Sequence, residues 1–335
     1  RQAFVVQLTQ PDGITRDVTD QAQVTFANPA FAKAEKGVVY PVADGATEMT
    51  VAVAGQALKV PVKVTQAKVD PPVSFKRDVM PVFMRAGCNQ GGCHGAARGK
   101  DGFRLSLFGF DPDGDHFRLT RELSGRRINL ALPNDSLLIE KACGRVAHGG
   151  GGKLKDGDEY TKTLLRWLEA DAPLDAPTVA LPTSLEVYPP GAVLDGKGEK
   201  QRVVVRAKYA DGTDRDVTSL ALFMTSNETA AKIAADGDGT VTAGDRGEAF
   251  VMARFHTFTI GVPFITLPKG LAFTWPNAPE NNYVDTLVHA KLKKLRVEPS
   301  GTCSDEVFVR RVYLDITGLL PTADEFARSA GLQPA

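Results

Sequence analysis

Short apolar runs of the type that forms β-strands occur in two stretches of the chain, residues 1–67 and 183–268. Val60-Pro61-Val62-Lys63-Val64 alternates along its length, and Val203-Val204-Val205 is β-branched throughout. Such residues fit the pleated, half-buried surface of a sheet, and Asp-Gly pairs, which favour turns, occur in both stretches at Asp12-Gly13 and Asp211-Gly212. Short strands with frequent turn signals predict an all-β sandwich for each stretch.

The two stretches are copies of one unit. Residues 12–19 and 211–218 are identical at six of eight positions and share the pattern Asp-Gly-x-x-Arg-Asp-Val-Thr at an offset of 199. The second copy opens with an apolar strand at residues 185–189 that has no counterpart before the first copy. Because native sandwiches normally cover their strand edges, we expect the first copy to begin inside a domain.

Between the copies, residues 72–175 change to the apolar spacing that is typical of helices. Tyr160, Leu164, Trp167 and Leu168, for example, fall on one face of a helix. Asp and Asn favour the first position of a helix and Gly its end. The expected helices start at Asp78, at Asn134 or Asp135, and at Asp156 or Asp158, and they end at Gly87, Gly144 and Pro173. An Asp111-Pro112-Asp113-Gly114 turn separates the first two.

Helical spacing resumes after the stretch Trp275-Pro276-Asn277-Ala278-Pro279. Apolar residues recur from Tyr283 to Leu292 and again from Val307 to Leu314. The remaining residues are too few to close a core of their own, so residues 280–335 are expected to be the start of a larger helical domain.

Composition narrows the classes of protein. The chain has 335 residues, enough for several domains, of which 43% are hydrophobic and 24% charged. Its 40 Lys and Arg balance 40 Asp and Glu, which argues against nucleic acid as the main partner. No apolar run reaches the roughly 20 residues of a membrane helix, so no membrane span is expected in this chain.

Candidate chemistry is concentrated in Cys88-Asn89-Gln90-Gly91-Gly92-Cys93-His94. Covalent haem c attachment uses two cysteines followed directly by His, which becomes an iron ligand, but with two residues between the cysteines. Here the spacer has four residues, and its two glycines allow the loop to bulge. A Cys88–Cys93 disulfide and a structural zinc site are the alternatives. The disulfide leaves His94 unexplained, and zinc lacks a second matching pair.

His148 is the first choice for the sixth iron ligand, because it precedes a run of four glycines that would let the backbone approach a cofactor. Met80, Met84 or an open sixth position are the alternatives. Arg126 and Arg127 could pair with haem propionates through forked hydrogen bonds. The expected metal ligands are therefore His94 and His148.

The segment resembles a known family. The runs that carry the resemblance to the planctomycete cytochrome c-like domain are Phe75–Phe83, Cys88–Gly95, Phe103–Asp111, Arg126–Asn129, His148–Gly151 and Leu165–Leu168. The repeat, with Val-x-Val-x-Ala-x-Tyr-x-Asp-Gly in its second copy, is similar to the bacterial immunoglobulin-like group 2 domain of cell-surface proteins. Residues 282–321 look like the opening of a planctomycete domain of unknown function that follows the haem domain in large exported proteins.

The resemblance implies a multi-domain fold in which two Ig-like all-β sandwiches (1–67 and 183–268) flank a small all-α cytochrome c-like haem domain (72–175), followed by a partial helical segment (280–335). It implies one covalent haem c, an unknown redox partner protein and an extracytoplasmic location, in the periplasm or at the cell surface. The expected function is an electron-transfer module rather than a complete enzyme. The alternatives are a surface adhesion or scaffold protein whose Ig-like domains bind glycan or protein, and the electron-entry part of a larger redox enzyme.

Overall fold

The computed structural model describes residues 1–123, 125–234 and 237–329. The chain divides into two compact units, residues 1–271 and 272–335, which are described separately. The predicted ranges 1–67, 72–175 and 183–268 lie in the first unit. The predicted range 280–335 lies in the second, and its residues 330–335 are outside the described residues.

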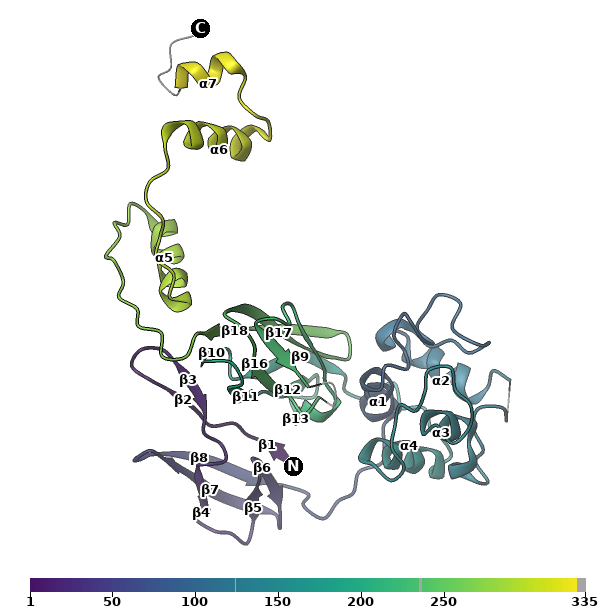
Figure 1. Ribbon diagram of the computed structural model, residues 1–335. Coiled ribbons are helices and arrows are strands. Elements are labelled where there is room, and N and C mark those ends of the chain that lie inside the picture. The colour runs from purple at the N-terminus through teal and green to yellow at the C-terminus, as the bar shows by residue number, and fades with distance from the viewer. Residues whose placement is uncertain (124, 235–236, 330–335) are drawn as a thin grey trace. The chain divides into compact units, whose positions relative to one another are not determined.

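The first copy of the repeat forms three small sheets, with strand orders β1-β6-β5, β2-β3 and β4-β7-β8 (Figure 1). All pairs in them are antiparallel. The strands are β1 (Gln2–Ala3), β2 (Gln7–Thr9), β3 (Thr15–Asp17), β4 (Gln23–Phe26), β5 (Ala32–Glu35), β6 (Val38–Pro41), β7 (Gly45–Val53) and β8 (Gln56–Val64).

The second copy is more complete. Its sheets have the orders β13-β12-β9, β11-β16-β15 and β10-β18-β17-β14, and β10 joins β18 in parallel. The strands are β9 (Pro182–Tyr188), β10 (Ala192–Asp195), β11 (Lys200–Arg202), β12 (Val204–Tyr209), β13 (Asp214–Asp216), β14 (Leu222–Thr225), β15 (Ala231–Ile233), β16 (Thr240–Ala243), β17 (Gly247–Phe255) and β18 (Phe258–Leu267). Strands β9 and β10 have no counterpart among the described residues of the first copy.

The two copies hold each other through equivalent atoms of the repeat. The backbone N–H of Ala3 donates to Oδ2 of Asp216 at 2.6 Å, and the backbone N–H of Arg202 donates to Oδ2 of Asp17 at 2.8 Å. Ala3 corresponds to Arg202 and Asp17 to Asp216 at the offset of 199, so the two hydrogen bonds are equivalent. Each Asp also accepts from the Thr two residues later in its own copy. In each copy, the Asp of the repeated Asp-Val-Thr therefore accepts hydrogen bonds both from its own turn and from the backbone of the other copy.

Short helices make up the segment between the copies. Asp158 caps the last of them, as the sequence predicts, and Asp111, expected in a plain turn, caps an additional helix. A π-helical turn at Phe75–Val79 leads into the first helix. The helices are α1 (Met80–Arg85), α2 (Pro112–Thr120), α3 (Leu137–Ala142) and α4 (Glu159–Glu169).

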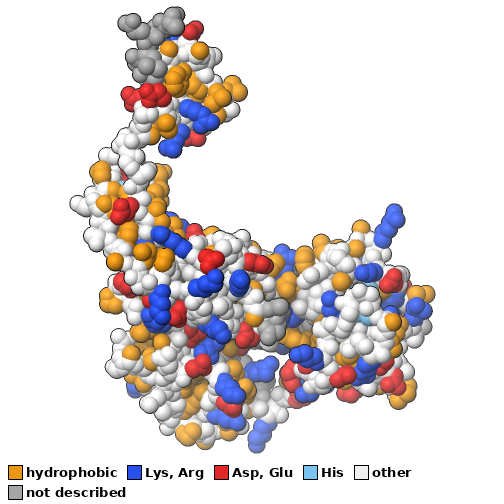
Figure 2. Space-filling view, viewed as in Figure 1, with side chains coloured by type: hydrophobic (Ala, Val, Ile, Leu, Met, Phe, Trp, Pro, Cys, Tyr) orange, Lys and Arg blue, Asp and Glu red, His pale blue; other side chains and the backbone are white. Residues whose placement is uncertain are grey.

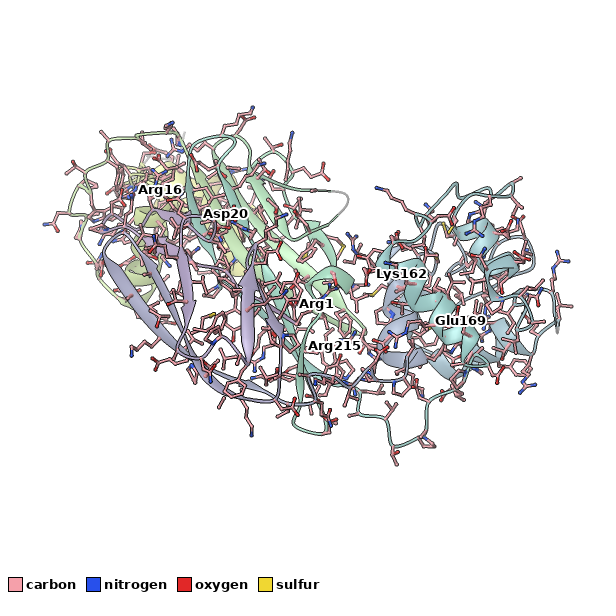
Figure 3. All side chains as sticks on the ribbon, turned by 90° about the horizontal axis from the view of Figure 1, so that it is seen from below. Arg1, Arg16, Asp20, Lys162, Glu169 and Arg215 are labelled. Carbon is pink, nitrogen blue, oxygen red and sulfur yellow. The ribbon has the colours of Figure 1, made fainter. Side chains whose placement is uncertain are left out.

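The core of the first unit runs without a break from this segment into the second copy. Trp167 is fully buried against Phe75 at a ring-centroid distance of 5.2 Å, and its Nε1–H donates to the carbonyl of Pro173. Arg215 of the second copy, labelled in Figure 3, forms an ion pair of 2.6 Å with Asp78. The helical segment is thus attached to strands by both apolar and charged contacts.

The predicted fold class is therefore wrong. The described residues form mostly β-structure in six small sheets, without a separate all-α cytochrome c-like domain between two sandwiches. The longest helix of residues 72–175 has 11 residues, and irregular chain joins the helices. Because these helices are too short to enclose a core alone, they share one with the second copy.

The second unit contains three helices among its described residues: α5 (Tyr283–Leu295), α6 (Asp305–Thr317) and α7 (Ala323–Ser329). Asn282 and Asp285 form a capping box at the start of α5. His289 is buried against the ring of Trp275 and lies 3.3 Å from a carboxylate oxygen of Glu280. Among the described residues of the whole chain, no helix is both long and apolar enough to cross a membrane.

Candidate functional site: a pocket between two histidines

The Cys88–His94 loop is shaped by backbone contacts that begin at the end of α1. The N–H of Cys88 donates to the carbonyl of Phe83 at 2.8 Å, and the N–H of His94 donates to the carbonyl of Cys88 at 3.0 Å. Gly95 then passes so close to Asn89 that a Cβ at Gly95 would lie 2.1 Å from its carbonyl oxygen. Only glycine fits there, so Gly95 fixes the path of the chain as it leaves the loop.

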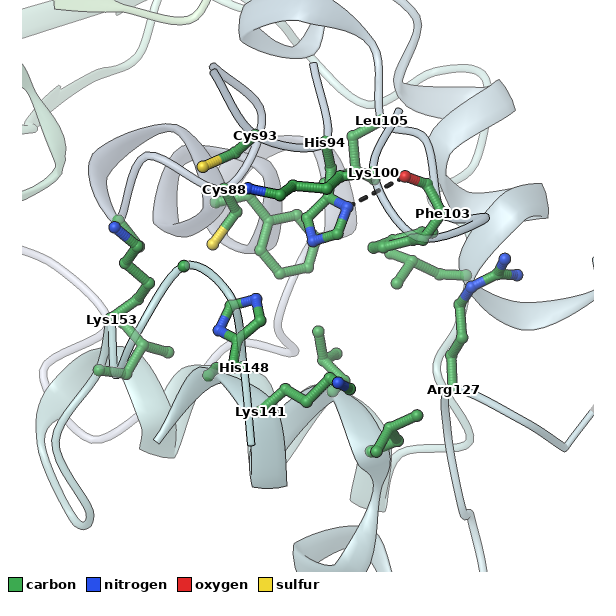
Figure 4. Close-up of a pocket in the computed structure, with 18 of the residues that line it drawn as sticks. Cys88, Cys93, His94, Lys100, Phe103, Leu105, Arg127, Lys141, His148 and Lys153 are labelled. Atoms are coloured by element: carbon green, nitrogen blue, oxygen red, sulfur yellow. Dashed lines mark hydrogen bonds between the residues drawn. The ribbon is translucent and has the colours of Figure 1, made fainter. Parts of the chain in front are cut away.

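His94 presents one ring nitrogen to a pocket. Its Nδ1 lies 3.0 Å from the carbonyl oxygen of Phe103, drawn as a dashed line in Figure 4. A carbonyl only accepts, so Nδ1 carries the proton and Nε2 keeps a free lone pair. Burial lowers the pKa of His94 and outweighs the opposing hydrogen bond to Phe103, so the neutral ring is favoured.

His148 repeats this arrangement from the glycine run. Its Nδ1 lies 2.8 Å from the carbonyl of Gly151, so its Nε2 is also left as an acceptor. The rings of His148 and His94 are parallel within 7°, and their centroids are 6.2 Å apart. Both side chains and the Cys88 and Cys93 sulfurs border the same space (Figure 4). The structure thus brings four residues singled out from the sequence into one pocket.

The remaining wall of the pocket is apolar, with cations around it. The apolar side chains come from α1, α2, α3 and α4 and from the chain between these helices: Val82, Phe83, Leu105, Leu119, Leu137, Leu138, Leu154 and Leu164. Five cations line it, Lys100, Lys141, Lys153, Arg126 and Arg127, together with one carboxylate, Asp101. An apolar space with cations suits a ligand that has a flat hydrophobic body and anionic groups.

The four cysteines of the chain are free thiols in the structure. Burial raises the pKa of Cys88 to about 12, with a further contribution from Cys93, so Cys88 is a neutral thiol at neutral pH. Cys143, at the end of α3, is half-buried, and its sulfur lies 3.7 Å from the hydroxyl of Thr161. Burial raises the pKa of Cys143 as well.

Arg127 and Arg126 differ in their surroundings. Arg127 is buried, and its guanidinium forms an ion pair of 3.0 Å with Glu122. Arg126 is exposed. Three backbone carbonyls accept from the Arg127 guanidinium, those of Gly102, Arg118 and Glu122. Arg127 therefore ties the chain around the pocket together, and pairing of either arginine with propionates stays a prediction.

Sequence reasoning missed the carbonyl groups that orient the two histidines. Phe103 and Gly151 supply them through the backbone, and a backbone carbonyl has no residue signature. The run of glycines before Lys153 was the available signal, since it allows the turn in which Gly151 accepts from His148. Among the described residues, no group of three or more His, Cys, Asp or Glu side chains could hold a metal ion, so the zinc alternative lacks a ligand set.

Comparison with known proteins gives one family match, to residues 283–330. It is to PSCyt2, described as a protein of unknown function (DUF1549). Among solved structures, domains 4 and 5 of the S-layer protein SbsC match at 11% identity and a TM-score of 0.23, covering 78% of this chain and 79% of that one. Domains 5–6 of the same protein match at 19% identity and a TM-score of 0.24, covering 31% of this chain and 57% of that one. Domains 1–6 match at 11% identity and a TM-score of 0.24, covering 81% of this chain and 29% of that one. No curated protein matches.

These findings correct the assignment made from the sequence. The family match lies where the sequence predicts the start of a domain of unknown function, outside residues 72–175. The described residues of 72–175 form no separate all-α domain. The recognition of a planctomycete cytochrome c-like domain between Ig-like domains is therefore wrong, and so are the electron-transfer function and the assignment as a cytochrome that rested on it. The comparisons give no support for haem or metal binding.

Proposed function

We propose that this chain is a structural module of a cell-surface assembly, in which the two copies form a scaffold. The observation that carries the proposal is the reciprocal contact between them, in which Asp17 and Asp216 each accept from the backbone of the other copy. A contact built twice from the repeated motif fixes the two copies to each other, which is what a scaffold requires.

An ion pair between Asp17 and Arg202 strengthens one of these two contacts. The side chain of Asp17 is only 6% exposed, and Arg202 Nε lies 3.0 Å from its Oδ2. Burial by itself raises the pKa of Asp17, but hydrogen bonds from Thr19 and Arg202 outweigh it and hold the pKa below its ordinary value. The folded protein therefore favours the ionised carboxylate. On the face shown in Figure 2, Lys and Arg side chains are interspersed with Asp and Glu.

The location is tested in intact cells that produce the full-length protein. We expect an antibody against residues 1–271, or an added protease, to reach the protein before the cells are lysed. A protein that is reached only after the cells have been lysed would contradict the surface role. A cytoplasmic enzyme measured in the same samples serves as the control for lysis.

The ligand of the pocket is a separate matter, and haem c is our proposal for it, without an electron-transfer role. The rings of His94 and His148 are parallel within 7°, their centroids are 6.2 Å apart, and both border the pocket. Their oriented Nε2 atoms and the apolar wall also fit the group. Cys88 and Cys93 would hold it, each thiol adding across one vinyl group, and haem would supply an iron centre.

We expect the chain, produced in cells that attach haem c, to gain the mass and absorption bands of one haem. Cys88→Ala together with Cys93→Ala should abolish covalent attachment, and His148→Ala should convert a low-spin spectrum to a high-spin one. His256→Asn, a change in the β17–β18 turn, is the matched control and should leave the spectrum unchanged. Purified chain without haem from such cells would end this proposal, and a low-spin spectrum in His148→Ala would remove His148 as a ligand.

A further inference from the structure

A second cavity lies where the chain enters and leaves the helical segment. Residues 71–78 lead into that segment and residues 173–179 lead out of it, and members of both stretches line the cavity together with α4 and Arg215 of β13. The cavity measures about 690 Å³, within the range of pockets that hold small molecules. It shares no lining residue with the pocket of His94 and His148, so it is a separate cavity.

Three arginines line this cavity: Arg77, Arg166 and Arg215. Two of them have carboxylate partners. Arg215 pairs with Asp78 at 2.6 Å, and Arg166 pairs with Asp70 at 2.8 Å. Within the part of the chain that the structure describes, no carboxylate forms an ion pair with Arg77, although its side chain is half-buried. Arg77 is thus the cation of the cavity whose charge is not matched.

The hydroxyl of Tyr209 on β12 is a second polar group that lacks a partner. Tyr209 is only 3% exposed, and its hydroxyl makes no hydrogen bond of standard geometry to any described residue. The Arg77 guanidinium lies over its ring, 4.2 Å from the centroid. Burial raises the pKa of Tyr209, and the nearby charges of Arg215 and Arg77 offset this rise only in part, so the hydroxyl keeps its proton. It is therefore a buried donor.

The two carboxylates that line the cavity are already engaged. Asp78 accepts from the backbone N–H of Ser74 at 2.9 Å in addition to its pair with Arg215. Asp175 accepts from the backbone N–H of Lys76 at 2.7 Å. The groups that remain without a partner at this place are donors, and a guanidinium has no acceptor to offer. A complementary ligand must therefore accept hydrogen bonds and carry negative charge.

We propose that this cavity binds an oxyanion group, a carboxylate, sulfate or phosphate, at Arg77 and Arg215 beside the Tyr209 hydroxyl. A guanidinium can donate two parallel hydrogen bonds to such a group, and stacking on Tyr209 holds the plane of Arg77 in place. Arg215 lies between the strands and the helical segment (Figure 3). A bound oxyanion thus connects the helical segment to the second copy. The apolar part of the wall has room for a body that carries the group: Pro71, Pro72, Pro173, Leu174 and Val179.

This inference goes beyond the scaffold role and does not depend on it, because binding is measured with the purified whole chain. Isothermal titration calorimetry at constant ionic strength compares sulfate, phosphate, glucuronate and, as the neutral control, glucose. We expect saturable binding of an anion at one site per chain and no binding of glucose. Tighter binding of sulfate or phosphate identifies a free inorganic ion as the ligand, and tighter binding of glucuronate identifies the acidic group of a sugar.

Three variants assign the binding to this cavity. Arg77→Met keeps an unbranched side chain over Tyr209 but removes the charge, and it should weaken binding at least about tenfold. Arg98→Met removes the same charge from an exposed residue outside the cavity and should bind like the native chain. Tyr209→Phe should weaken binding about threefold, yet without anion it should unfold no more readily than the native chain, because it removes a hydroxyl that has no partner.

Three results would overturn the proposal. One is a folded native chain that binds none of the three anions. Another is equal binding by the native chain and Arg77→Met, because it would show that the ion binds elsewhere, for example among the cations around the pocket of His94 and His148. The third is a Tyr209→Phe chain that binds like the native chain but is clearly less stable without anion, since the hydroxyl would then be satisfied within the protein.

Discussion

Replacing Asp17 by Ala is expected to lower the free energy of unfolding of the first unit by about 3 kcal/mol, because it leaves the partly buried Arg202 without its main partner and one backbone N–H without an acceptor. Denaturant titration followed by tryptophan fluorescence and circular dichroism measures the change. Asp20 also pairs with Arg202, at 2.8 Å, but is 75% exposed. Asp20→Ala should therefore change the free energy of unfolding by no more than about 0.5 kcal/mol.

The contribution of Asp17 to the stability of the protein also depends on pH. Because the pKa of Asp17 is lowered on folding, its contribution to stability is complete above the ordinary value of 3.8 and is lost as the pH falls through the lower, folded value. The native chain should thus lose more stability than Asp17→Ala below pH 3.8. Equal losses in both proteins, or equal effects of the Asp17 and Asp20 variants, would remove this contact as the connection between the copies.

Replacing Gly95 by Ala is expected to disrupt the loop that holds Cys88, Cys93 and His94. The added Cβ would meet the backbone oxygen of Asn89 at 2.1 Å, and a backbone atom cannot yield as a flexible side chain does. We expect a loss of about 3 kcal/mol in the free energy of unfolding, at the upper end for overpacking, and loss of any ligand that the pocket holds.

Gly92 is the matched control, because a Cβ there has nothing within 4 Å. Gly92→Ala should keep both the stability and the ligand. Thermal unfolding measures the first quantity, and the absorption spectrum of protein from haem-attaching cells measures the second. A Gly95→Ala protein as stable as Gly92→Ala would show that the loop takes another path.

The sequence predicted the local features that side chains signal directly. Asp158 caps α4 as expected, and the repeat marks two β-rich copies. The predicted start of the first helix was less accurate. Ser74 caps the first helical turn, four residues before Asp78, whose carboxylate accepts from the N–H of Ser74. A helix start shared by two polar residues gives two competing signals in sequence.

The sequence did not show which segments pack against each other in the folded chain. Residues 72–175 have the apolar spacing of helices, but nothing in that spacing shows that their core continues into the second copy. The contact between Asp17 and Arg202 joins residues 185 apart and is invisible to local patterns. Within the pocket, the residue types of Cys88, Cys93, His94 and His148 were informative, whereas the backbone carbonyls that orient the histidines were not.

The contact between the copies also limits how the chain can assemble. Since each copy offers the other the same acceptor and the same donor, the contact is isologous and closes on itself. Two copies saturate it, and a third finds no free group of this kind. Any larger array must therefore form through a different surface of the molecule. A heterologous contact at that surface would decide whether the molecules form a closed pair or an open lattice.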